Sequence, residues 1–328
     1  MSSDDTQQNV KRKALERARA EIAEYQRRKD VEEANKKDNH GFTQLHRAAQ
    51  VGDLVKCQEL VKIGADVNIL DNTGSTAIMY ASYNCYYDIV SLLCDNNADL
   101  HVKENKYGET VLMEASSQGN LDMAKLLISK GAKVDDVNKR GETVLTLASN
   151  VKEFKLCKFY ISKGAHISSI NDNMLEFFDW ATTNNDEDLV EKLKIPAFFK
   201  SASKGNLKKM KHFVEQLEVD VNSLNEDGDS ALTLAANNKH FQVCDYLINA
   251  PGIDLRASLK PLQKLFSSNP LESGTIMTSF IEILKSESDS VSLPSTGIGK
   301  KDEMLNKWID EIQSTSDVTE DVEAGEIV

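Results

Sequence analysis

Apolar and small residues recur along the chain at fixed distances from a series of glycines. The numbers of Gly41, Gly74, Gly108 and Gly141 differ by 33, 34 and 33, and Gly228 opens a similar segment further on. An alanine stands seven positions after each glycine, and apolar residues follow that alanine at six, nine, twelve and thirteen positions. Spacings of three and four place such residues on one buried face of a helix. The pattern therefore predicts two helices in each repeat of about 33 residues.

Turn-forming residues separate the predicted helices. Gly52 and Gly119 lie between the two helices of their repeats. Each second helix reaches a residue that can adopt the left-handed conformation and close it, namely Gly64, Asn97, Gly131 or Gly164. After each second helix, one apolar residue is followed by polar residues up to the next glycine. This arrangement predicts a hairpin loop between repeats.

Two weaker repeats interrupt this regularity. Residues 174–193 carry the anchoring small residue at Ala181, and residues 198–214 carry it at Ser201, only 20 positions later. One hairpin loop must be missing between them, and we expect the stack to bend or shift there. The chain is predicted to be an all-α solenoid of about seven repeats, near 38–70, 71–103, 104–137, 138–170, 171–195, 196–224 and 225–257.

The repeats resemble the ankyrin repeat. The stretch TQLHRAA (43–49) is similar to the threonine-proline-leucine-histidine-x-alanine signature of that family, with Gln44 in place of proline, and GADVN (64–68) is similar to its repeat ending. The resemblance covers residues 38–257. It implies stacked helix pairs, a His46 side chain that bonds to neighbouring turns, and binding of another protein through the hairpin tips and the exposed face of the first helices.

Both flanks of the array differ from the repeats. Residues 1–37 lack glycine and proline and predict a charged helix with a short apolar stripe at Leu15, Ala18, Ile22 and Tyr25. Three interpretations remain open for this helix: it is solvated, it packs on the first repeat, or it forms a coiled-coil homodimer.

The C-terminal flank is predicted in three parts. Residues 258–286 contain two short amphipathic helices that could cover the open end of the last repeat. Residues 287–299 have the composition of a linker. Residues 300–328 hold an amphipathic helix and an acidic tail, and this helix either folds back on the array or docks in a groove of a partner.

The net charge, the hydropathy and the distribution of the cysteines limit the functions that the chain can have. The net charge of -13 argues against direct nucleic-acid binding. There is no apolar run long enough to span a bilayer, so we expect no membrane insertion. The five cysteines are scattered and predict reduced thiols, which suits the cytoplasm, with the nucleus as the alternative.

The sequence offers no recognisable catalytic chemistry. It contains no glycine-rich phosphate loop and none of the common hydrolase, metalloprotease or kinase motifs. Cys57, Cys157 and Cys244 occupy one equivalent position in three repeats, which indicates core thiols and not metal ligands. We therefore expect neither an enzyme nor a bound cofactor or metal.

The expected binding surface follows from the resemblance. Tyr83 and Tyr107 are expected to be exposed beside cations and to form a binding hot spot, whereas Tyr87 is expected to be buried. The full candidate set is Asn72, Thr73, Tyr83, Asn84, Lys106, Tyr107, Lys139 and Arg140. The predicted function is a non-catalytic adaptor or scaffold for protein binding, and the alternative is an acidic inhibitor of a basic nuclear factor.

One modification is also suggested by the resemblance. Leu60 lies eight residues before Asn68 in an ADVN turn. This spacing is similar to the target pattern of asparaginyl hydroxylase in ankyrin proteins. Asn68 is therefore a candidate hydroxylation site.

Overall fold

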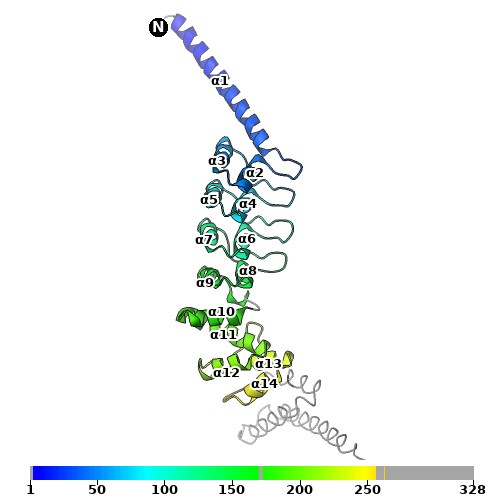
Figure 1. The fold of residues 1–328 in the computed structure, drawn as a ribbon. Helices are drawn as coiled ribbons and strands as arrows, with labels where there is room; N and C mark the ends of the chain where they lie inside the picture. Colours follow the sequence, from blue (N-terminus) through cyan, green and yellow to red (C-terminus); the bar gives the residue numbers. More distant parts are fainter. Residues whose placement is uncertain (1–2, 170–172, 256–261, 263–328) are drawn as a thin grey trace, which may run out of the picture. The chain divides into compact units, whose positions relative to one another are not determined.

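The computed structural model describes residues 3–169, 173–255 and 262. The chain divides into two compact units, Met1–Asn173 and Met174–Val328. Regular structure in the described residues is helical (Figure 1), apart from one isolated bridge between Leu224 and Ser230. None of the helices in these residues is long and apolar enough to cross a membrane.

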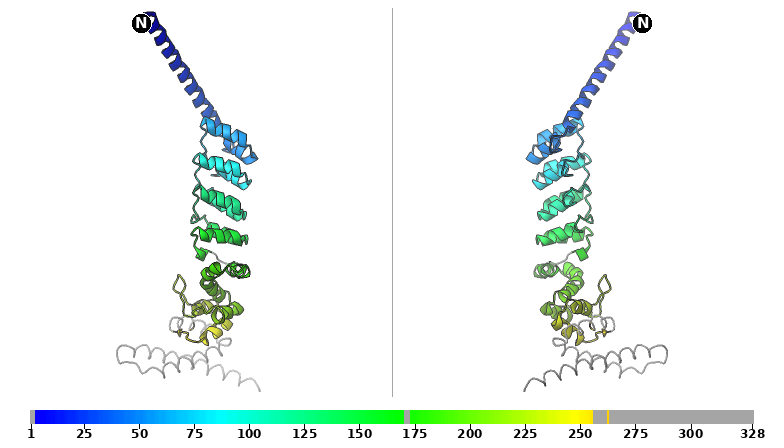
Figure 2. Two further views of the ribbon diagram at one scale, coloured as in Figure 1. Left: turned by 90° about the vertical axis from the view of Figure 1, so that its left-hand side faces the viewer. Right: turned by 90° about the vertical axis from the view of Figure 1, so that its right-hand side faces the viewer.

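The N-terminal unit contains four consecutive helix pairs. In the side views of Figure 2, the pairs lie in successive layers. The first helix of each pair contacts the first helix of the next, and the second helices of the first three pairs contact one another in the same way. The pairs are α2 (Gln44–Val51) with α3 (Leu54–Ile63), α4 (Ala77–Tyr83) with α5 (Tyr87–Asp95), α6 (Val111–Ser117) with α7 (Leu121–Ser129), and α8 (Val144–Asn150) with α9 (Phe154–Ser162). A short 3-10 helix, η1 (Ile167–Ser169), follows α9.

Two of the positions that the pattern placed in the core are buried in all four pairs, whereas the residues six positions after the alanine are half-buried or, at Tyr87, exposed. The alanine that follows each glycine by seven positions is nearly inaccessible at Ala48, Ala81, Ala115 and Ala148. The equivalent position in the second helices holds Cys57, Val90, Ala124 and Cys157, all fully buried. Small side chains at these positions let neighbouring helices approach closely. Each repeat therefore depends on the next for its apolar contacts.

Side-chain caps begin several of the first helices. Thr43, Thr110 and Thr143 each accept a hydrogen bond from the backbone N–H three residues on. His46 completes the first cap, because its Nδ1 accepts from the Thr43 N–H at 3.2 Å. Its Nε2 donates to the Ser75 carbonyl oxygen at 3.1 Å, which ties the first repeat to the second as expected.

Most hairpin loops are built around one side-chain acceptor. The acceptor stands three residues before the glycine and takes hydrogen bonds from the backbone N–H groups two and four residues after it. Such local bonds replace the ladder bonds that a loop lacks. The residues in this role are Asp38, Asp71, Asn138 and Asn225.

The loop of the third repeat is one residue longer. This insertion accounts for the wider spacing between Gly74 and Gly108. Glu104 takes the acceptor role four residues before the glycine, and its longer side chain reaches the N–H groups of Lys106 and Tyr107. A glutamate thus compensates for the extra residue.

Backbone hydrogen bonds also join successive loops. The Asn72 N–H donates to the His40 carbonyl oxygen at 3.1 Å. The Asn105 N–H donates to the Thr73 carbonyl oxygen at 2.8 Å. The Lys139 N–H donates to the Tyr107 carbonyl oxygen, also at 2.8 Å. These bonds fix the spacing of the hairpin tips along the N-terminal unit.

The N-terminal helix, α1 (Ser3–Asn35), packs on the first repeat through its last turns. Ala34 is buried, Val31 is half-buried, and the Asn35 side chain accepts from the Asp66 N–H at 3.0 Å. In contrast, Leu15, Ile22 and Tyr25 are exposed. The helix is therefore packed at its C-terminal end and exposed at Leu15, Ile22 and Tyr25, and the homodimer stays a prediction.

The C-terminal unit contains α10 (Met174–Thr183), α11 (Glu187–Ser203), α12 (Leu207–Glu215), α13 (Ala231–Asn237) and α14 (Phe241–Ile248). The boundary predicted between the fifth and sixth repeats, at 195/196, lies inside α11 and not between two helices. This single helix of 17 residues continues through Pro196 and serves both as the second helix of one repeat and the first helix of the next. The missing hairpin loop is thereby explained.

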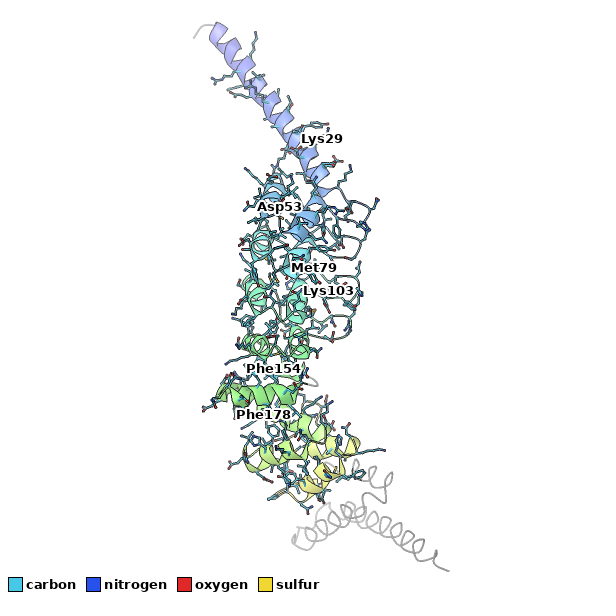
Figure 3. All side chains as sticks on the ribbon, viewed as in Figure 1. Lys29, Asp53, Met79, Lys103, Phe154 and Phe178 are labelled. Carbon is cyan, nitrogen blue, oxygen red and sulfur yellow. The ribbon has the colours of Figure 1, made fainter. Side chains whose placement is uncertain are left out.

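Aromatic side chains fill the core around this shared helix. Phe178, labelled in Figure 3, lies with its ring centroid 4.9 Å from that of Phe213. Phe198 of α11 lies 6.3 Å from Phe213 in an edge-on arrangement. Tilted and edge-on contacts of this kind favour a single packing.

The predicted C-terminal segments lie mostly outside the described residues. This applies to the capping helices at 258–286, the linker at 287–299 and the amphipathic helix with its acidic tail at 300–328. Leu262 is described and is fully buried.

Candidate protein-binding surface

The structure divides the eight predicted binding residues into two groups. Tyr83 and Asn84, at the end of α4, line a groove beside the first helices. The other six lie in the hairpin loops of the second, third and fourth repeats, namely Asn72, Thr73, Lys106, Tyr107, Lys139 and Arg140.

The ring of Tyr107 is contacted by two cations. The Lys106 Nζ lies 4.5 Å from the ring centroid, and the Arg140 Cζ lies 4.6 Å from it. The residue is half-buried and not exposed as predicted. A backbone hydrogen bond holds Tyr107 against the fourth loop, and the cations cover the ring there.

Several of the other loop residues hold the loops together. The Asn72 Nδ2 donates to the Asn39 carbonyl oxygen at 3.0 Å, and the Thr73 Oγ1 donates to Asp71 at 2.6 Å. The Lys139 Nζ donates to the carbonyl oxygen of Asn105. These three side chains have structural partners already.

Tyr83 is the most exposed aromatic residue in the described repeats, with 62% of its surface accessible. It lies at the C-terminal end of α4, a helix that is buried on its other face. The expectation for Tyr87 is wrong, because it is 39% exposed and its hydroxyl donates to Asn120 Oδ1 at 3.0 Å.

The groove has a volume of about 330 Å³ and lies between the second and third repeats. One wall is apolar and aromatic, formed by Met79, Tyr80 and Tyr83 of α4; Figure 3 labels Met79 in the column of first helices. The Tyr80 hydroxyl donates to Asp71 Oδ2 at 2.6 Å and is thereby fixed. The polar lining residues are Gln50, Ser75, Asn84 and Thr110.

Three carboxylates complete the lining, from Glu104, Glu109 and Glu114. Burial raises the pKa of Glu109, and the charge of Glu114 raises it further. Burial also raises the pKa of Glu114. Burial works in the same direction on Glu104, but hydrogen bonds from the backbone N–H groups of its loop outweigh it and hold the pKa of Glu104 below its usual range. The groove is therefore acidic, with two carboxylates whose ionised forms are poorly solvated.

Replacing Glu109 and Glu114 together by glutamine should raise the urea concentration needed to unfold the protein at about pH 7. The pKa of both carboxyls is raised in the folded state, so their ionisation destabilises it relative to the unfolded chain. This destabilisation fades as the pH falls through the raised pKa values toward the usual glutamate value of 4.5. Urea midpoints measured between about pH 7 and about pH 4.5 should therefore converge for variant and wild type.

The charge-matched control for this prediction is Asp88→Asn with Asp122→Asn. Both aspartates are exposed on second helices, away from the groove. A control that shows the same pH-dependent gain would contradict the assignment to Glu109 and Glu114, because the gain would then come from overall charge. Arg140 is the cation that acts on Glu109, and it is retained in both variants.

Nothing in the sequence pattern indicates directly that the three carboxylates form a set. They stand at positions 104, 109 and 114 in a chain with 52 acidic residues. Glu104 and Glu109 flank the loop, and Glu114 follows one helical turn after the Thr110 cap. Their spacing on either side of a loop could have indicated that they face one another.

Asn68 has a structural role in the stack. It is exposed, its Nδ2 donates to the Asn97 carbonyl oxygen at 3.0 Å, and its Oδ1 accepts from the Asp99 N–H at 2.8 Å. Asn222 makes the equivalent pair of bonds to Gly252 and Asp254 in the C-terminal unit. Asn68 thus joins two repeats, and its hydroxylation stays a prediction.

The buried thiols are poor nucleophiles in this environment. Burial raises the pKa of Cys57 to about 11 and that of Cys157 and Cys244 to about 12. A protonated thiol is neither a good nucleophile nor a metal ligand. Within the described parts of the chain, no group of three or more histidine, cysteine, aspartate or glutamate side chains is placed to hold a metal ion.

Comparison with known proteins gives a consistent family match. The family model described as "Ankyrin repeats (3 copies)" matches residues 13–104, 98–171 and 166–258. The "Ankyrin repeat and KH domain-containing protein mask-1" of Caenorhabditis elegans is 36% identical over 96 residues, which are 28% of this chain and 4% of that protein. The "Ankyrin repeat and SAM domain-containing protein 6" of Mus musculus is 31% identical over 132 residues, 37% of this chain and 14% of that protein.

A smaller relative is matched over a larger share of its length. The "Probable 26S proteasome regulatory subunit p28" of Saccharomyces cerevisiae is 32% identical over 96 residues, 29% of this chain and 42% of that protein. The chain therefore matches less than half the length of each of these relatives.

Proposed function

The chain belongs to the ankyrin-repeat family, and on that basis we propose that it is a non-catalytic adaptor or scaffold that binds a partner protein through the groove and hairpin tips of its N-terminal unit. Ankyrin repeats generally mediate protein–protein interaction. The function of this chain is inferred from that family role together with its own surface.

The observation that carries the proposal is the exposed Tyr83 on the edge of the groove. Tyrosine supplies a large contact area at a low cost in conformational entropy and is enriched among residues that dominate binding energy. Tyr83 stands on α4, whose Ala77, Ile78 and Ala81 are almost fully buried. A rigid support of this kind reduces the entropy lost on binding.

A binding role also agrees with the chemistry of the side chains. Burial keeps the thiols of Cys57, Cys157 and Cys244 protonated by raising their pKa values. His46 is committed to holding two repeats together. These potentially reactive groups therefore have structural roles, and we propose that the chain acts by contact and not by catalysis.

Replacing Tyr83 by alanine should reduce recovery of the partner by about tenfold or more, because loss of a central tyrosine at an interface costs about 2 kcal/mol. The measurement is affinity purification with the full chain as bait, followed by quantitative mass spectrometry of the recovered proteins. Tyr25→Ala is the matched control, since Tyr25 is similarly exposed but lies on α1, away from the groove.

Two results would move the binding site elsewhere. One is undiminished recovery with Tyr83→Ala, and the other is an equal loss with Tyr25→Ala. The circular dichroism of both variants should match the wild type, because neither side chain is buried.

An acidic regulator of a basic nuclear factor is the second candidate function. The net charge of -13 and the three glutamates in the groove favour a basic partner. Nuclear localisation, together with binding that weakens steeply as salt is added, would favour this candidate over a general adaptor.

A further inference from the structure

The groove between the second and third repeats combines features that select a particular occupant. Its aromatic wall is Tyr83 with Tyr80, and its charged side is Glu109 with Glu114. None of the described residues that line it is a lysine or an arginine. We propose that this groove receives an arginine side chain from an extended segment of the partner protein, with the guanidinium between the Tyr83 ring and the carboxylates of Glu109 and Glu114. This inference rests on the proposed binding function.

The cations nearest the groove are engaged elsewhere. Arg140, whose charge lowers the pKa of Glu109 without forming an ion pair with it, lies over the Tyr107 ring and pairs with Glu142 at 3.7 Å, and Lys106 lies over the same ring. In the part of the chain that the structure describes, neither Glu109 nor Glu114 forms an ion pair with a basic side chain. Among the same residues, the side-chain donor to Glu114 is the neutral amide of Gln118, at 3.0 Å.

The electrostatic energy of the two carboxylates favours the entry of a cation into the groove. Half-buried carboxylates that lack a paired cation destabilise the folded protein, and Glu109 and Glu114 repel one another as well. A cation that entered the groove would relieve both effects. The Coulomb attraction within an ion pair is also stronger at a partly desolvated site than on an open surface.

The lining of the groove favours arginine over lysine. A planar guanidinium can stack on a tyrosine ring while its N–H groups donate to carboxylates, whereas an ammonium is a compact and strongly hydrated charge. Tyr83 provides an exposed ring that lines the same groove as the carboxylates, so one group in the groove could make both contacts. The volume of about 330 Å³ suits one long side chain, which points to an extended segment and not to a folded surface.

The test uses the full chain and a short synthetic peptide, acetyl-Gly-Ser-Gly-Arg-Gly-Ser-Gly-amide. A second peptide carries citrulline in place of arginine, which keeps the shape of the side chain and removes its charge. A third carries lysine. Binding is followed by amide chemical shifts of the isotope-labelled protein during titration with each peptide. The protein variants are Glu109→Gln with Glu114→Gln, and the control is Asp88→Asn with Asp122→Asn.

We expect the arginine peptide to shift the amides around Tyr83, Glu109 and Glu114. Its affinity should be at least about tenfold higher than that of the citrulline peptide, a difference of about 1.4 kcal/mol. The reason is that the uncharged citrulline cannot form an ion pair with the carboxylates. The double glutamine variant should lose this preference and the control should keep it. Equal binding of the arginine and citrulline peptides, or shifts confined to other repeats, would overturn the proposal. Lysine binding as tight as arginine would overturn the choice of guanidinium.

The outcome can be separated from that of the proposed function. If the arginine peptide fails to bind the groove while Tyr83→Ala still abolishes recovery of the partner, the arginine proposal is wrong and the adaptor function stands. If the peptide binds as expected but no partner depends on Tyr83, the groove chemistry stands and the adaptor function is wrong.

Discussion

Replacing Phe213 by alanine should lower the free energy of unfolding of the C-terminal unit by about 3–5 kcal/mol. Phe213 is fully buried on α12 and lies against the rings of Phe178 on α10 and Phe198 on α11. Its removal would therefore open a cavity among three helices at once. The shared helix α11 has no separate hairpin loop to hold its two repeats, so packing of its side chains must do so.

Urea unfolding together with amide hydrogen exchange measures this effect, and the exchange data show where protection is lost. We expect the loss over α10 to α14. Leu224→Ala is the control in the same unit. Leu224 is 55% exposed, so its replacement should lower the free energy of unfolding far less. A change below about 1 kcal/mol for Phe213→Ala would mean that the aromatic cluster does not stabilise this unit.

The second large effect is expected at Gly41. Gly41→Ala should destabilise the first two repeats by roughly 2–5 kcal/mol, as the sum of a left-handed backbone cost and a steric clash. Gly41 has a φ of +80°, and a Cβ atom there would lie 2.6 Å from the backbone nitrogen of Asn72. That nitrogen donates to His40, so the clash would break the hydrogen bond between the first two loops.

Gly141 offers a matched control for this prediction. It has a similar φ of +75°, but a Cβ atom there would meet nothing within 4 Å. Gly141→Ala should therefore cost only about 1–2 kcal/mol. Hydrogen exchange in α2 to α5, compared with that in α6 to α9, separates the two variants. Equal destabilisation would show that backbone conformation alone matters and that the loop contact contributes nothing.

Much of the regular architecture could be predicted, because the residues that specify it are local. The helix breaks at Gly52 and Gly119 both have positive φ, and so do the closing residues Gly64, Asn97 and Gly131. A left-handed turn needs only one suitable residue at one position, and such a residue is visible in the sequence.

The boundary between the fifth and sixth repeats could not be predicted from side-chain spacing within a repeat. The short interval between Ala181 and Ser201 indicated a missing loop, but the predicted boundary at 195/196 falls inside a helix. Pro196 favours a break, since proline removes a hydrogen bond from a helix interior. Burial of Leu193, Ala197 and Phe198 along α11 outweighs that cost.

The exposure of the candidate binding residues was predicted in part. Tyr83 and Asn84 were placed on an exposed face, and the structure has them at the edge of the groove, but Tyr107 is covered by Lys106 and Arg140. The sequence suggested that these cations are free to bind a partner. The position of Arg140 over the ring depends on contact between the loops of two different repeats, and hydropathy patterns carry no information on such contacts.

By itself, the sequence determined the repeat period, the helix pairs and the buried face of each helix, because these follow from side-chain spacing within one repeat. Tertiary structure alone decided that Glu104, Glu109 and Glu114 would line one groove with Tyr83 and without a basic residue among the described lining. The physical reason is that the tyrosine and the carboxylates come from different repeats. Their distances are set by the stacking of the helices and by the one extra residue in the third loop.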